Sequence, residues 1–166
     1  MKIRGDTVIS DYRTGRILFA HHNVITNTGK TRAAELLGGL AGVTPPDRFI
    51  KFMAVGDGGA SSASPSTPFI PLATNTGLAN ELARVSALNP IVIGVNQLKF
   101  QSLFLTTPPL PFASPTFKVI NEVGLFFGDD VQPGTPRMFA RNTYPSIPFD
   151  TTDREGVIVS WTVSIV

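Results

Sequence analysis

The side chains best suited to chemistry in this sequence are two adjacent histidines and a few carboxylates. His21 and His22 could bind a metal ion or act as a general base. Neighbouring residues of a strand point to opposite faces of a sheet, so the two histidines cannot easily bind the same ion within one chain. The remaining way for them to bind a metal is an ion shared between subunits on a symmetry axis. Asp57, Asp129 and Asp130 lie beside glycines and could bind calcium, but no calcium-loop spacing accompanies them. We therefore expect turn residues here and no metal site.

The sequence also lacks the residue spacing that known catalytic motifs require. Gly29, Lys30 and Thr31 match the end of a phosphate-binding loop, but that loop needs a glycine five residues earlier, where Val24 stands. A hydrolase would need a nucleophile with a base and an orienting group, and no serine lies in a Gly-x-Ser-x-Gly turn. A glycosidase would need two carboxylates across a cleft, and nothing in the sequence pairs Glu35, Glu81, Glu122 or Glu155. We expect no enzyme and no cofactor.

The composition limits which partners the protein can have. Hydrophobic residues make up 42% of the chain and charged residues only 16%, against about 25% in typical domains. A surface so poor in charge is more often covered by partners than exposed to water. The net charge is +2 and the basic residues are scattered, so we expect no nucleic-acid partner. Cysteine is absent, which excludes disulfides, and no segment approaches about 18 apolar residues, so we expect no membrane partner.

The first part of the chain predicts a hairpin and then a helix. Apolar stretches at 6–10 and 16–20 flank turn residues, which predicts an N-terminal hairpin within residues 1–22. A capping sequence at 27–29 precedes apolar residues with helical spacing, and Gly42 and two prolines follow them. The residues with helical spacing are Ala33, Leu36, Leu37 and Leu40. Such a short amphipathic helix must pack against a sheet, because it cannot bury its apolar stripe alone.

The rest of the chain alternates strands with proline-rich loops. Extended proline-rich loops are expected at 60–77 and 106–116, and residues 78–84 fit a short helical or extended link. Residues 157–165 alternate strictly and place Trp161 on the apolar face of their strand. Further strands are expected at 49–55, 91–93, 98–105, 117–127 and 138–141. We predict a single, mainly β domain over residues 1–166: an antiparallel sandwich or barrel of about eight strands with one packed α-helix.

Four charged residues have candidate structural roles. Glu81 and Arg84 are three residues apart and could pair on one helical face. Glu122 interrupts an apolar strand, so it either faces solvent or satisfies a buried cation or backbone amides. Arg84 and Arg141 are the candidate cations for that second arrangement.

A set of short segments follows in order from about residue 23 to residue 166. They are Asn23-Val24-Ile25-Thr26-Asn27-Thr28-Gly29, Ala54-Val55-Gly56-Asp57-Gly58-Gly59, Leu78-Ala79-Asn80-Glu81-Leu82-Ala83-Arg84, Asn121-Glu122-Val123-Gly124-Leu125-Phe126, Met138-Phe139-Ala140-Arg141, Pro148-Phe149-Asp150-Thr151 and Val159-Ser160-Trp161-Thr162-Val163. In order and spacing this set resembles small accessory virion structural proteins of tailed bacteriophages, of the capsid decoration or tail and fibre type. The resemblance implies a place in the virion, with assembly in the host cytoplasm, and no catalysis.

Two placements in the particle and one further role stay open. As a capsid-exterior decoration (cement) protein, the chain would stabilise the shell by self-association, with a trimer favoured, and by contact with the major capsid protein. As a tail fibre or baseplate component it would bind tail proteins instead. As a host-surface or carbohydrate-binding module it would use Trp161, Tyr12 or Tyr144, although the strand pattern places Trp161 in the core.

Contacts with partners are expected from the N-terminal hairpin and from the proline-rich segment after residue 106. Extended proline-rich chain and exposed strand edges are suited to lie across a partner. The candidate interface residues are Ile3, Tyr12, Pro108, Pro109, Leu110, Pro111 and Phe112.

Overall fold

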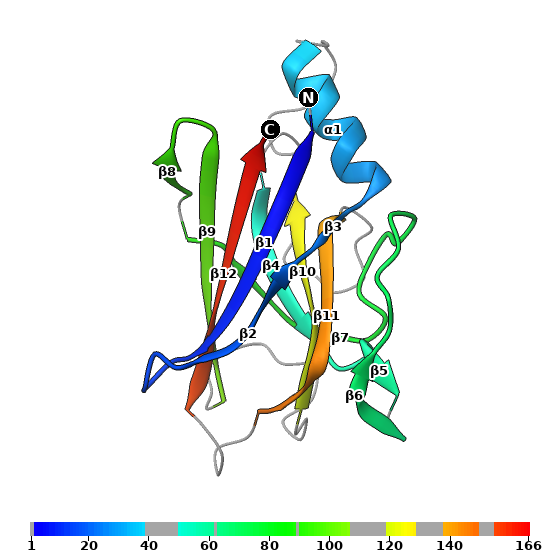
Figure 1. Cartoon of the computed structure of the whole chain (residues 1–166), viewed down its shortest axis with the longest axis vertical. Coiled ribbons are helices and arrows are strands. Elements are labelled where there is room, and N and C mark those ends of the chain that lie inside the picture. The colour runs from blue at the N-terminus through cyan, green and yellow to red at the C-terminus, as the bar shows by residue number, and fades with distance from the viewer. Residues whose placement is uncertain are drawn as a thin grey trace.

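The chain folds into a β-sandwich with one short helix (Figure 1). The computed structural model describes residues 2–38, 50–61, 63–88, 90–106, 119–128, 138–149 and 155–166, without the side chains of Leu36 and Leu37. These residues form twelve strands and one helix, and ten of the strands make two five-stranded antiparallel sheets. The predicted mainly β, antiparallel sandwich with a single helix is thereby confirmed.

The first sheet joins the two ends of the chain. Its strand order is β2-β1-β12-β9-β8, and β1 pairs with β12 along its whole length. The strands are β1 (Ile3–Asp11), β2 (Ile17–His22), β8 (Ile91–Gly94), β9 (Gln97–Leu105) and β12 (Gly156–Ile165). Strands β1 and β2 form a hairpin inside the predicted residues 1–22, and its turn contains Gly15 with a φ of 69°, a left-handed conformation that favours glycine.

The second sheet is buried more deeply. Its order is β3-β11-β10-β4-β7, and a separate ribbon pairs β5 with β6. The strands are β3 (Val24–Ile25), β4 (Ile50–Gly56), β5 (Ala60–Ser61), β6 (Ser64–Pro68), β7 (Glu81–Ser86), β10 (Val119–Phe127) and β11 (Met138–Pro148). Eight of the nine residues of β10 are buried, so both faces of this sheet are covered at its centre.

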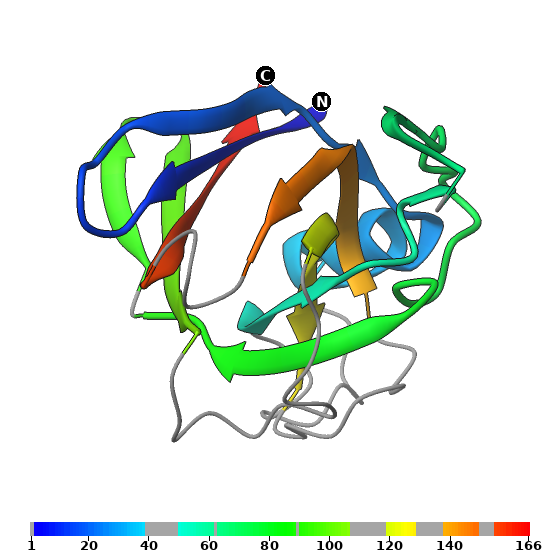
Figure 2. The ribbon, with the colours of Figure 1, turned by 90° about the horizontal axis from the view of Figure 1, so that it is seen from below.

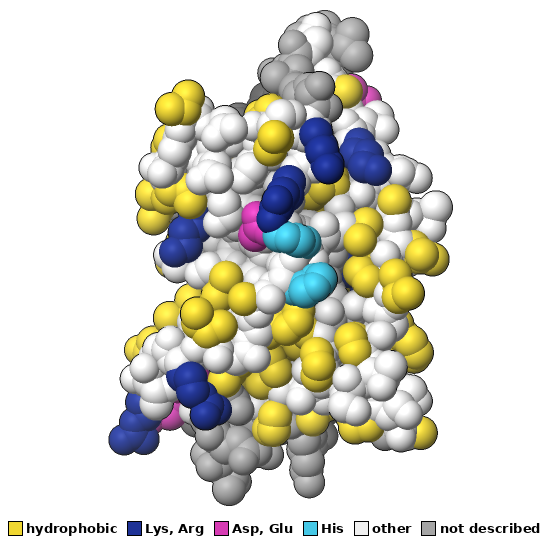
Figure 3. All heavy atoms as spheres, in the orientation of Figure 1, with side chains coloured by type: hydrophobic (Ala, Val, Ile, Leu, Met, Phe, Trp, Pro, Cys, Tyr) yellow, Lys and Arg dark blue, Asp and Glu magenta, His cyan; other side chains and the backbone are white. Residues whose placement is uncertain are grey.

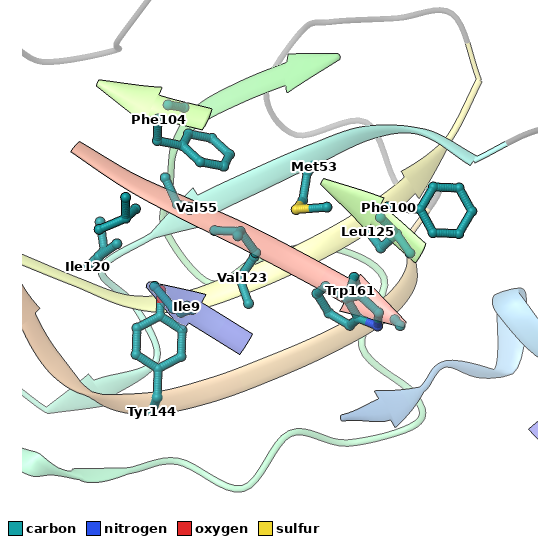
Figure 4. Packing of buried hydrophobic residues seen from close by; sticks show 14 of the residues in the cluster. Ile9, Met53, Val55, Phe100, Phe104, Ile120, Val123, Leu125, Tyr144 and Trp161 are labelled. Atoms are coloured by element: carbon teal, nitrogen blue, oxygen red, sulfur yellow. The ribbon is translucent and has the colours of Figure 1, made fainter. Parts of the chain in front are cut away.

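The main core lies between the two sheets (Figure 4). Trp161 of β12 is its largest fully buried side chain, as the alternating pattern of its strand predicted. The first sheet also supplies Phe100 and Phe104, and the second sheet supplies Met53 and Leu125 from the opposite side. A smaller cluster covers the other face of the second sheet and contains Phe52, Ala54, Phe126, Met138 and Leu78.

The helix α1 (Asn27–Gly38) packs against β11, as Figure 2 shows from below. Its first turn is capped by Thr26, whose hydroxyl accepts a hydrogen bond from the Gly29 N–H (3.0 Å) and donates to the Met138 carbonyl (2.6 Å). The cap therefore precedes the predicted residues 27–29, because the side chain that reaches the third N–H of the helix is that of Thr26. Within the described residues no helix has the length and apolar character needed to cross a bilayer.

Two segments differ from the prediction, and a third takes one of the two conformations expected for it. Strand β11 continues past Arg141 to Pro148, and its exposed Pro145 lies where the pairing with β10 shifts register, so the missing N–H breaks no regular ladder. Residues 81–86 form a strand, which is the extended one of the two conformations expected for the link at 78–84. Residues 60–77, expected as a loop, contain β5 and β6, and together with β3 and β7 these short strands raise the number from the predicted eight to twelve among the described residues. Of the expected loop 106–116, only Thr106 lies within the described residues.

Candidate functional site

A fully buried carboxylate organises the outer face of the second sheet. Glu122 of β10 is 0% exposed. Its Oε1 accepts hydrogen bonds from the N–H groups of Asn80 (2.8 Å) and Gly58 (3.1 Å). Its Oε2 accepts from the Ala79 N–H (3.0 Å) and from two nitrogens of Arg141, Nη2 at 2.6 Å and Nε at 3.2 Å. One side chain thus joins β10 and β11 to the turn after β4 and to the segment before β7.

This arrangement makes Glu122 a structural anchor, and its oxygens are not available to act as a general base or as a nucleophile. Each oxygen already holds at least two donors, so neither can take a substrate proton or attack a substrate. The Arg141 guanidinium and three backbone amides replace the water that burial removes from this carboxylate. Of the two predicted arrangements for Glu122, the structure therefore has the one that satisfies a buried cation and backbone amides.

Arg141 extends the network to the chain that covers it. Its Nη1 donates to the Asn75 side-chain oxygen (3.0 Å), and that oxygen also accepts the Leu72 N–H (2.8 Å). The loop that contains residues 72–80 is therefore attached to the sheet through side-chain oxygens, where no strand pairing holds it. This gives the loop a defined position.

Glu81 and Arg84 form a second buried ion pair on the same face. Nε and Nη2 of Arg84 donate to the two oxygens of Glu81 at 2.7 and 2.8 Å, and the guanidinium lies 4.0 Å from the centre of the Phe126 ring. The pair lies on a strand and not on a helix. A register shift between β4 and β7 makes Leu82 an extra residue, and this bulge turns positions 81 and 84 to the same face.

Close backbone approach makes a glycine necessary beside Glu122. A Cβ on Gly56 would lie 2.2 Å from the Asn80 carbonyl oxygen and 2.6 Å from Oε1 of Glu122. Neither atom can yield without breaking the network, because the carbonyl is backbone and the carboxylate is fully bonded. The side chain of residue 56 must therefore be absent.

Changing Gly56 to alanine should lower the free energy of unfolding by about 1–3 kcal/mol, as overpacking does. Gly77 is the matched control, because a Cβ there would meet nothing within 4 Å. Gly77→Ala should be neutral or stabilise by up to about 1 kcal/mol through the unfolded chain. Urea denaturation of both variants measures the difference, and equal stability would show that the Gly56 backbone can move away.

Tyr144 supports the anchor from the core side. It is fully buried and its hydroxyl donates to the Glu122 carbonyl at 3.2 Å. Burial, and to a lesser degree the charge of Glu122, raises the pKa of Tyr144 well above its usual value. The phenol therefore keeps the proton that this hydrogen bond requires.

The histidines and turn aspartates do not form a metal site in the described part of the chain, where no three ligand-type side chains gather. His22 contacts Asp6 and Arg4, and its ring lies 5.8 Å from that of His21. Asp57 accepts a hydrogen bond from the Asn80 side chain (2.5 Å), as a turn residue does. Asp129 and Asp130 lie outside the described residues.

The most prominent exposed feature is an apolar edge at β8. This strand is the last of its sheet and pairs only with β9. Val92 is 72% exposed, and Val95 in the β8–β9 turn is fully exposed. We call apolar edge the exposed side chains of Leu88, Ile91, Val92, Ile93, Val95 and Leu98, beside which lie Ile165 and Val166 at the end of β12. In Figure 3 hydrophobic side chains gather at the upper left, where Figure 1 places β8.

Sequence reasoning did not single out this edge. The run Ile91-Val92-Ile93 is typical of a buried strand, and an apolar run looks the same in a sheet centre and at an exposed edge. Edge strands are usually protected by charged residues and prolines, and residues 91–95 contain neither. This absence was the sequence signal for an exposed apolar edge.

The structure separates the predicted interface residues. Ile3 is half-buried against the main core at one end of β1, and Tyr12 is 45% exposed just beyond the other end. The strand between them spans roughly 30 Å, so one small patch cannot contain both. The remaining candidates, Pro108, Pro109, Leu110, Pro111 and Phe112, lie outside the described residues.

The aromatic residues considered for sugar binding are mostly inaccessible. Trp161 and Tyr144 are fully buried and cannot stack on a sugar, which leaves Tyr12 as the exposed member of the three. A second exposed apolar group, Phe69, Ile70 and Leu72, lies after β6 on the segment that leads to the Glu122 network.

Comparison with known proteins gives no relative for this chain: no family model, no curated protein and no solved structure matches it.

Proposed function

We propose that this protein is a non-enzymatic structural component of a tailed-phage virion, which decorates the capsid exterior and stabilises the shell. It acts by binding copies of itself and subunits of the capsid. The observation that supports an assembly role is the apolar edge, an uncharged strand on a sandwich whose other sheet is fixed by buried ion pairs. The virion location is supported by the sequence resemblance.

An exposed apolar edge strand is suited to assembly for two reasons. Its unpaired N–H and C=O groups can add a strand from another chain, and its side chains gain free energy when covered. Native proteins usually protect such edges with charge, proline, bulges or short strands. Strand β8 carries no charge, but it has only four residues, contains a register shift and follows Pro90, so its exposed apolar side chains are the main contact that it offers. Two identical edges would pair around a twofold axis, whereas a trimer requires the edge to meet a different surface of the next copy.

Changing Val92 to lysine should abolish self-association and leave the fold intact. A lysine on an edge strand opposes pairing, and a substitution at so exposed a site should alter stability by no more than about 0.5 kcal/mol. Ile70→Lys is the control, since Ile70 is 84% exposed on the other apolar group. Sedimentation velocity should show oligomers for the unchanged protein and for Ile70→Lys, and a 17.8 kDa species for Val92→Lys. Oligomers that persist in Val92→Lys would exclude this edge as the contact.

The number of copies in the particle separates capsid from tail. A protein that covers capsid subunits is needed in hundreds of copies, and a tail fibre or baseplate part in a handful. The low charge of the chain suits both placements, and the proline-rich segment at 106–116 suits a clamp that lies across neighbouring capsid subunits.

A further inference from the structure

A groove opens where the chain crosses from the first sheet to the second. Its volume is about 690 Å³, within the range of about 300–1,000 Å³ typical of ligand sites. Three of its lining residues are cationic, Lys2, Arg4 and Lys30, and its apolar surface comes from Ile3, Val24 and Ile25. Its lining residues come from the start of β1, the end of β2, β3 and α1. In Figure 1 the strands β1 and β3 diverge from the end of β2 towards α1.

Both walls of the groove are strand edges. Lys2 exchanges two backbone hydrogen bonds with Val166 (2.6 and 2.7 Å), so in the alternating antiparallel pattern Ile3 directs its N–H and C=O to the opposite side. The pairing of β1 with β2 begins only at Asp6, so no described strand covers that side at Ile3. On the other wall the Thr26 N–H binds the Phe139 carbonyl of β11 (3.0 Å), and Ile25 therefore directs its backbone groups away from β11.

The positive charge of the groove is only partly compensated. None of the described residues that line it is acidic. Arg4 lies 3.4 Å from Asp6, but Lys2 and Lys30 form no ion pair within the described residues. In Figure 3 dark blue side chains lie above the two cyan histidines on this face, with a magenta acidic side chain beside them. A ligand that fits must therefore bring negative charge.

We propose that the groove binds an extended acidic segment of a partner protein, which adds a short strand beside Ile3 and places carboxylates near Lys2, Arg4 and Lys30. A free phosphate would use the cations but not the apolar surface or the strand edges, and an extended peptide uses all three. Alternate side chains of such a strand point to opposite sides, so acidic residues at every second position would face the lysines. This inference goes beyond the proposed function, because the groove is a different surface from the apolar edge.

The test is an NMR titration of the full chain with a peptide of about six alternating glutamate and valine residues. Saturable binding should shift the amide signals of Ile3 and Ile25, and added salt should weaken it. The same peptide with glutamine in place of glutamate should bind at least about tenfold more weakly. The double change Lys2→Glu and Lys30→Glu should also cost about tenfold, since several surface charge pairs together amount to about 1.4 kcal/mol. Arg16→Glu, in the β1–β2 turn, is the control and should bind normally.

Three results would overturn the proposal: no binding by the unchanged protein, equal binding by the double variant, or the same shifts with inorganic phosphate alone. The last would make the groove a simple anion site. The sedimentation of Val92→Lys tests the apolar edge and the peptide titration tests the groove. A negative titration therefore leaves the assembly proposal intact, and a negative sedimentation result leaves the groove proposal intact.

Discussion

Replacing Glu122 with glutamine should lower the free energy of unfolding by about 3–5 kcal/mol, the usual cost of removing one partner of a buried ion pair. The shape of the side chain is almost unchanged, so the loss comes from charge and hydrogen bonding. Whichever way the amide turns, its NH2 group faces donors: the N–H groups of Asn80 and Gly58 on one side, or the Ala79 N–H and Arg141 on the other. The Arg141 guanidinium would also stay buried without its counter-charge.

Glu155→Gln is the matched control, because Glu155 is exposed and lies 3.7 Å from an exposed Arg13. It should change stability by no more than about 0.5 kcal/mol. The pair Glu122→Gln with Arg141→Met should cost less than the sum of the single changes, since each removes the charge that the other leaves unpaired. Guanidinium denaturation measures all four variants, and a loss below about 1 kcal/mol for Glu122→Gln would show that water reaches this carboxylate.

Replacing Trp161 with alanine should destabilise the fold by about 3–5 kcal/mol. The indole is 0% exposed at the centre of the core, where residues from both sheets surround it. Both lost apolar contact and the cavity left behind contribute to this cost. The variant should therefore unfold at a clearly lower temperature.

Thr162→Ala, the next residue of the same strand, faces the other side of the sheet and is half-buried. It separates loss of core packing from a general weakening of β12, and it should cost under about 1 kcal/mol. Calorimetry of the two variants gives the comparison. An unchanged melting temperature for Trp161→Ala would place the indole at a surface.

The fold was largely predictable, because β-strand periodicity is a local property. Residues 157–165 alternate so strictly that the strand and the buried position of Trp161 follow from the sequence, although at its end Ser164 is buried and Ile165 is exposed. The strand predicted at 138–141 continues to Pro148 in the structure, and the register shift opposite β10 explains how Pro145 fits within it. The sequence did not distinguish a helix from a strand at β7. Its charged residues Glu81 and Arg84 are buried as an ion pair, and no local sequence pattern reveals such burial.

The anchor was only partly predictable. The apolar neighbours of Glu122 left two arrangements open, an exposed carboxylate or a partnered one, and Arg141 was one of two candidate cations for the second. The three backbone amides that complete its shell come from residues 58, 79 and 80, and they converge only because the pairing of β4, β7 and β10 brings those turns together. The apolar edge was missed since the position of β8 at the sheet margin is a property of the topology.

The proposal that this chain is a structural protein of a virion is tested most directly by counting it in purified particles of a phage whose genome carries its gene. Quantitative mass spectrometry against the major capsid protein gives the number of copies per particle. A capsid decoration protein should be present in hundreds of copies, in a fixed ratio to the major capsid protein. A handful of copies would move the protein to the tail, and absence from the particle would contradict the account.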